Sequence, residues 1–158
     1  MVTEVNGLRL AYRGLIAGLA GGYVWAAIAM LLSGLADGDP LRPLRPIALA
    51  FSPVASSPEL AFVLGLAAIQ GGGALIGMCF AYFFARFFTV RATLAIAAPV
   101  FTVLIWGLVV AAASRDVGSV AFATHPIPAL ASLGYGLLLG AALPIRRDVT
   151  RYDGSPST

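Results

Sequence analysis

Charged side chains are scarce in this chain, and their scarcity excludes an ordinary soluble domain. Only 11% of the 158 residues are Asp, Glu, Lys or Arg, whereas soluble domains carry about 25%. Hydrophobic residues make up 59% of the sequence, and the mean hydropathy is +0.92. A soluble fold of this composition would expose large apolar patches and aggregate. The composition therefore indicates a membrane-embedded protein.

Residues that bind metals or carry out catalysis are also rare. Lysine is absent, and cysteine and histidine occur once each, as Cys79 and His125. These counts exclude an intrachain disulfide, a cysteine-based zinc site and a bis-histidine haem. The sequence has no nucleotide-binding loop, nucleophile triad or metalloprotease motif. We therefore expect no enzyme activity, no metal and no haem, but bound lipid.

Four uncharged apolar runs each exceed the roughly 20 residues that a helix needs to cross a bilayer. Backbone groups in lipid must be satisfied internally, so these runs should be helices. The sequence thus predicts an all-α, four-transmembrane-helix bundle, forming one integral membrane domain over residues 1–158. The predicted spans are approximately 12–35, 60–85, 92–114 and 122–144, with an outer loop at 36–59. The first run is too long for a signal peptide, whose apolar region is about 7–15 residues.

The placement of arginine predicts the orientation of the bundle. Seven arginines lie on the side shared by the two termini and the link between spans two and three, and three lie on the other side. Basic residues near the spans favour the cytoplasm, so both termini should be cytoplasmic. We expect a multi-pass protein of the inner (plasma) membrane. Because the arginines come in ones and twos at the ends of apolar runs, nucleic acid is not an expected partner.

Small residues recur at four-residue spacing on three of the predicted helices. The three sets are Gly14, Gly18 and Gly22; Gly73 and Gly77; and Ser132, Gly136 and Gly140. On a helix this spacing gives a smooth face that another helix can approach closely. We therefore predict glycine-rich helix interfaces. Three such faces exceed what one internal contact requires, so a surplus should serve assembly with other membrane subunits.

The predicted outer loop contains five of the ten prolines, three of them in the repeat Pro40-Leu-Arg-Pro43-Leu-Arg-Pro46. This repeat blocks a continuous helix and favours an extended or turning path. Residues 47–54 are apolar but too few to cross the membrane. The loop is therefore either an ordered surface connection or a partner-docking or re-entrant element.

Three polar residues are candidates for a site, and two of them, Gln70 and His125, also have a structural alternative. Gln70 lies near the middle of the second span, where it could bond to another helix or hold a lipid, quinone or other cofactor. Tyr135 lies beside the small-residue face of the last span. His125 could be a haem or metal ligand, or an ordinary residue at the membrane interface.

Residues 13–30 (RGLIAGLAGGYVWAAIAM) and 133–144 (LGYGLLLGAALP) resemble the first and last spans of a family of small, uncharacterised four-helix bacterial integral membrane proteins. In that family a histidine often sits shortly before the tyrosine-glycine pair. Here Ser132 occupies that neighbourhood, and His125 lies further upstream. The resemblance implies a four-span topology and no activity.

These observations favour a non-catalytic accessory subunit of a larger membrane complex, with a respiratory or other electron-transfer assembly as the expected host. Besides the lipid bilayer, its partners would be other membrane protein subunits. The first alternative is a stand-alone small transporter or channel, although transporters usually place strongly polar groups within the membrane. The second is a haem-binding membrane protein that uses His125.

Overall fold

A computed structural model describes residues 7–52, 57–113 and 125–143 of the chain. Over these residues the regular elements are all helices, as the sequence predicts. The described part excludes residue 114, at the end of the third predicted span. It also excludes residues 122–124 and 144, at the two ends of the fourth predicted span.

The described chain forms four longer helices and two short ones. In order they are α1 (Gly7–Asp37), α2 (Arg45–Phe51), α3 (Pro58–Phe83), the 3₁₀ helix η1 (Ala85–Phe87), α4 (Arg91–Ala113) and α6 (Pro126–Ala142). Three of them are long and apolar enough to cross a membrane, namely α1, α3 and the Arg91–Val109 part of α4. The fourth apolar helix, α6, has 17 residues.

Local sequence signals explain where several helices begin and end. α3 starts with Pro58 after the N-cap Ser57, whose hydroxyl accepts a hydrogen bond from the Leu60 N–H at 3.3 Å. Proline suits a first helical position because the N–H that it lacks would have no partner there. At the end of α1, Gly38 adopts a left-handed conformation with φ of +70°. Glycine tolerates that conformation without a steric penalty, so it stops the helix.

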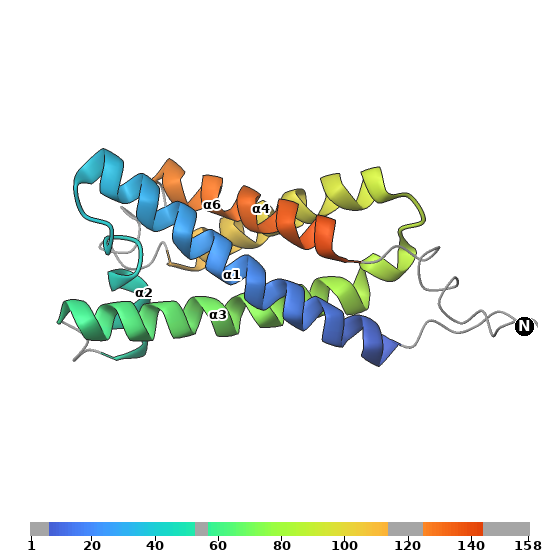
Figure 1. Cartoon of the computed structure of the whole chain (residues 1–158), viewed down its shortest axis with the longest axis horizontal. Coiled ribbons are helices and arrows are strands. Elements are labelled where there is room, and N and C mark those ends of the chain that lie inside the picture. The colour runs from blue at the N-terminus through green and yellow to red at the C-terminus, as the bar shows by residue number, and fades with distance from the viewer. Residues whose placement is uncertain (1–6, 53–56, 114–124, 144–158) are drawn as a thin grey trace, which may run out of the picture.

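The helices form an open bundle in which α1 packs against α3 and α6, and α6 packs against α4 (Figure 1). The spatial order is therefore α3, α1, α6, α4. The helices at the two ends of this order, α3 and α4, make aromatic contacts near η1. There the Phe101 ring lies 5.0 Å from that of Phe80 and 5.3 Å from that of Phe84.

Glycines bring α1 and α3 into direct backbone contact. A β-carbon at Gly14 would collide with the carbonyl of Gly77, and one at Gly18 would collide with that of Gly73. Gly22 is also tightly enclosed, because its β-carbon would lie 3.2 Å from the Ile69 carbonyl oxygen. These distances leave no room for any larger residue without a shift of one helix.

The small face of α6 is enclosed in the same way. A β-carbon at Gly136 would collide with Pro99 on α4, and one at Gly140 would lie 3.1 Å from the Leu94 carbonyl oxygen. Ser132 is buried and hydrogen-bonded within the bundle. All three predicted small-residue faces thus make contacts inside the chain. None of them remains as the surplus that the sequence led us to expect.

The proline-rich connection between α1 and α3 folds back onto the bundle as α2. Leu44 is fully buried, with its carbonyl 2.8 Å from where a Gly65 β-carbon would lie. Ala48 packs against Ala61 of α3. Helix α2 begins at Arg45, with Pro46 in its first turn, where proline is tolerated. The connection is therefore ordered over its described residues and packs against the side of α3.

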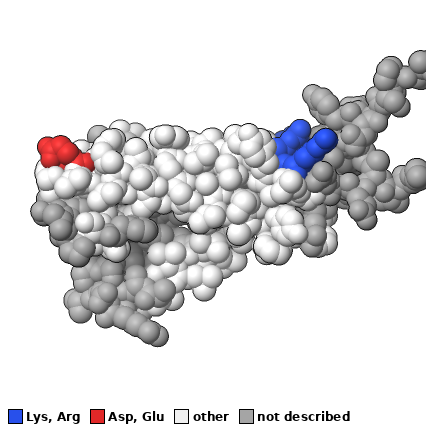
Figure 2. All heavy atoms as spheres, turned by 90° about the horizontal axis from the view of Figure 1, so that it is seen from below, with Lys and Arg blue, Asp and Glu red and all other residues white. Residues whose placement is uncertain are grey.

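Charged side chains gather at the two ends of the molecule. Figure 2 shows basic residues near one end and acidic residues near the other, separated by an uncharged surface. Arg9 and Arg13 lie in the first two turns of α1, whereas Asp37 ends that helix and Glu59 begins α3. An uncharged belt between charged ends is the surface expected of a helical bundle that crosses a bilayer.

Candidate functional site: a groove between α3 and α4

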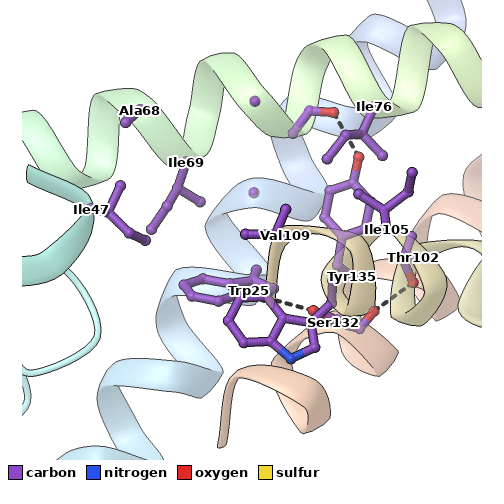
Figure 3. Close-up of a pocket in the computed structure, with 14 residues that line it drawn as sticks. Trp25, Ile47, Ala68, Ile69, Ile76, Thr102, Ile105, Val109, Ser132 and Tyr135 are labelled. Carbon is purple, nitrogen blue, oxygen red and sulfur yellow. Dashed lines mark hydrogen bonds between the residues drawn. The ribbon is translucent and has the colours of Figure 1, made fainter. Parts of the chain in front are cut away.

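The main candidate site is a groove of about 400 Å³ between α3 and α4 (Figure 3). Its walls come from α3 and α4, and its floor comes from α1 and α6. Ile47 of α2 lies at its edge. The lining is almost entirely apolar, and its principal residues are Trp25, Ile47, Ala68, Ile69, Gly72, Gly73, Ile76, Thr102, Ile105, Trp106, Val109, Ser132 and Tyr135.

The groove exists because α3 and α4 approach each other near η1, through the contacts of Phe101, but flank an open space further along. Small residues on α3 widen this space. Gly72 lines the groove, and a β-carbon built on it would meet nothing within 4 Å. Gly72 therefore leaves space beside α3 that no described residue fills.

A hydrogen-bonded cluster forms the floor of the groove. The indole N–H of Trp25 donates to the Ser132 hydroxyl oxygen at 3.1 Å, and that hydroxyl donates to the Pro128 carbonyl at 2.9 Å. The Thr102 hydroxyl lies 2.8 Å from the Ser132 carbonyl oxygen, to which it can donate. This cluster joins α1, α4 and α6, since each helix supplies one of its side chains.

Tyr135 connects the floor to the opposite wall. Its hydroxyl donates to the carbonyl of Gly73 at 2.6 Å, which links α6 to α3. The aromatic ring lies over Gly21 of α1, where a β-carbon would be only 2.6 Å from a ring carbon. Tyr135 can occupy this position only because α1 carries glycine at the contact.

The chemistry of the groove is that of a binding surface. Trp25, Thr102, Ser132 and Tyr135 all use their hydrogens inside the protein. The described lining contains no carboxylate, histidine or cysteine. A molecule in the groove would therefore meet apolar surface and a few hydroxyl oxygens that can still accept a hydrogen bond.

Gln70 lies outside the groove lining and reaches α1. In the amide orientation that satisfies both of its polar atoms, the side-chain nitrogen donates to the Leu19 carbonyl at 2.7 Å. The side-chain oxygen then accepts from the Tyr23 N–H at 3.1 Å. The amide thus serves the α1–α3 interface, and the Tyr135 hydroxyl bonds instead to the Gly73 carbonyl.

His125 lies at the start of α6, ten residues before Tyr135 on the same helix. As the N-cap residue, its Nδ1 accepts a hydrogen bond from the Ile127 N–H at 3.4 Å. Over the described residues, no three His, Cys, Asp or Glu side chains come together in a way that could hold a metal ion. Among the described residues, His125 thus acts as the N-cap of α6.

Sequence reasoning did not identify the groove or three of the residues in its floor and walls. Trp25, Thr102 and Gly72 showed no distinctive spacing, although Gly72 belongs to a run of three glycines. The two ends of the Trp25–Ser132 hydrogen bond are 107 residues apart. Only a buried indole N–H, which needs a partner in an apolar environment, could have indicated that such a bond exists.

No protein-family model, curated protein or solved structure matches this chain.

Proposed function

We propose that this protein is a non-catalytic subunit of a larger membrane assembly, and that the groove between α3 and α4 receives a transmembrane helix of its partner. The observation that carries this proposal is the open space beside Gly72, where a β-carbon would meet nothing within 4 Å. In lipid, helices associate through close packing at small residues, because no hydrophobic force drives them together. A ridge of large side chains on the partner would fill the space beside Gly72.

The distribution of the remaining glycines supports the same proposal. Gly72 and Gly107 both have room for a β-carbon, with nothing within 4 Å. They lie on α3 and α4, the helices that flank the groove, whereas the predicted glycines of α1 and α6 contact other parts of the chain. The side of the bundle formed by α3 and α4 thus retains small residues that internal packing does not use.

We further propose four membrane spans, with α6 as the fourth and both termini in the cytoplasm of a cell bounded by an inner membrane. Helix α6 has 17 residues, which is the lower limit of roughly 17–25 for a spanning helix. It packs between α1 and α4, two helices long enough to cross. The seven-to-three distribution of arginines supports the orientation. A respiratory or other electron-transfer complex is the host to test first.

Site-specific crosslinking in native membranes tests the proposal directly. A photo-crosslinking residue at Val109, which lines the groove, should capture one membrane protein in a defined ratio. The same residue at Leu104, an exposed position on α4 outside the groove lining, should capture it much less. Mass spectrometry of the product identifies the partner and hence the host complex. Equal capture at the two positions would contradict the proposal.

A matched pair of glycine variants gives an independent test. Gly72→Leu fills the groove, whereas Gly71→Leu adds the same side chain at an exposed position on the adjoining surface. Neither substitution meets a neighbour at its β-carbon, so both chains should fold. We expect co-purification of the partner in mild detergent to fall at least about tenfold in Gly72→Leu only. A wild-type chain that purifies alone as a monodisperse monomer would overturn the proposal.

The volume of the groove favours one second candidate, a site for an apolar small molecule or lipid chain in a stand-alone protein. At about 400 Å³ the groove is within the range of about 300–1,000 Å³ typical of ligand pockets. Native mass spectrometry distinguishes this function from the first. A retained small molecule that is lost in Gly72→Leu, with no protein partner, would establish a ligand site.

A further inference from the structure

We propose that Arg9 and Arg13, together with the apolar surface beside them, bind the headgroup and upper acyl chain of an anionic phospholipid. The inference rests on the proposed membrane placement but not on a partner in the groove. Arg9 and Arg13 are exposed and lie one helical turn apart on α1, so their guanidinium groups can reach the same ligand.

The two arginines border a surface cavity that also has an apolar side. Leu8, Leu15 and Met78 are among its lining residues, and Met78 is contributed by α3. Leu15 and Met78 lie further toward the middle of the bundle than Arg9, since Met78 adjoins Gly77, which packs against Gly14. The apolar part of the cavity thus continues inward from the arginines, as the hydrocarbon chains of a lipid continue inward from its phosphate.

The surrounding aromatic residues place this surface at the depth of lipid headgroups. Tyr12 lines the cavity and is 64% exposed, and the exposed Tyr82 of α3 lies against Gly7 at the same end of the bundle. Tyrosines concentrate at the membrane–water boundary, where the ring contacts lipid and the hydroxyl contacts water. The arginines are therefore positioned where phosphates would be found.

Arg9 and Arg13 differ in their ion pairing from the arginines at the opposite end of the bundle. Arg42 pairs with Asp37 at 2.5 Å and Arg45 pairs with Asp39 at 2.6 Å, so carboxylates of the same chain compensate both charges. Within residues 7–52, 57–113 and 125–143, no carboxylate forms an ion pair with Arg9 or Arg13. A guanidinium binds phosphate through paired hydrogen bonds, so an anionic headgroup complements this end of the molecule.

Native mass spectrometry of the full chain can test this inference with phosphatidylglycerol and phosphatidylcholine of identical acyl chains. We expect wild-type protein to retain phosphatidylglycerol preferentially. Arg9→Gln/Arg13→Gln should reduce that preference by about fivefold for each arginine, the size expected of one basic residue near an anionic surface. The control Arg42→Gln/Arg45→Gln removes the same charge from the paired end and should keep the preference.

Three results with the two lipids would overturn the inference. They are equal retention of the two lipids by wild-type protein, an unchanged preference in Arg9→Gln/Arg13→Gln, and an equal loss in Arg42→Gln/Arg45→Gln. Displacement of phosphatidylglycerol by millimolar inorganic phosphate would also overturn it, because the site would then bind phosphate alone. The exposed side chains of Arg9 and Arg13 should be replaceable without unfolding, which size-exclusion chromatography checks. Partner capture at Val109 should be unaffected, so the two proposals can fail separately.

Discussion

The Tyr135 hydroxyl donates a hydrogen bond to the Gly73 carbonyl across 2.6 Å, joining α6 to α3 beside the groove. Tyr135→Phe removes this bond and little else. We expect a loss of stability of about 0.5–1.5 kcal/mol, since a hydrogen bond between membrane helices contributes about 0.6 kcal/mol on average. Unfolding in a fixed detergent measures the loss. The control is Tyr23→Phe on the exposed face of α1, and equal effects of the two variants would contradict the prediction.

Substitution by alanine should lower the stability of the protein at Gly18 and raise it at Gly71, because the space around the two glycines differs. A β-carbon at Gly18 would collide with the Gly73 carbonyl, so Gly18→Ala must push α1 and α3 apart. Overpacking of this kind costs about 1–3 kcal/mol. At Gly71 a β-carbon meets nothing within 4 Å, and alanine should stabilise the helix by up to about 1 kcal/mol. Comparison of the two unfolding midpoints checks both signs; a stabilised Gly18→Ala would be inconsistent with this packing.

Gln70→Leu distinguishes a packing role from a transport role for the only amide of α3. The substitution removes both hydrogen bonds to the α1 backbone, at Leu19 and Tyr23, but keeps a similar volume. We expect a loss of about 0.6–2 kcal/mol in the free energy of unfolding, and no change in crosslinking from the groove. Flux assays in liposomes give the decisive comparison. Flux that is present in the wild type and lost in Gln70→Leu would favour the transporter alternative.

We expect His125 to stabilise the first turn of α6 and to bind no haem. Its Nδ1 accepts the Ile127 N–H, so His125→Ala removes an N-cap, whose loss costs about 0.5–2 kcal/mol. His125→Asn supplies another capping oxygen and should retain most of the stability. Unfolding measurements on both variants test the cap, and visible spectra of the purified protein test haem. A Soret band that disappears in both variants would establish the haem alternative.

Composition and local sequence pattern were enough to predict the helices, several of their boundaries and the small residues that share a helix face. Uncharged runs of sufficient length predict helices in lipid, and α1, α3 and α4 fit that description. Prolines and Gly38 lie at helix boundaries, because the backbone preferences of proline and glycine act within a few residues. The small-residue faces were also visible, since a four-residue spacing fixes which positions share a side of a helix.

Only the tertiary structure decided which faces meet. Gly18 faces Gly73, and Gly136 faces Pro99, because the helices rotate and cross so as to satisfy every contact in the bundle at once. The open position of Gly72 follows from that arrangement, since the same residue would be covered if α3 and α4 closed along their lengths. Likewise, Arg42 and Arg45 pair with Asp37 and Asp39, whereas Arg9 and Arg13 form no ion pair with any carboxylate of the described residues. A linear pattern records which residues share a face, but the identity of the neighbour depends on packing across the whole chain.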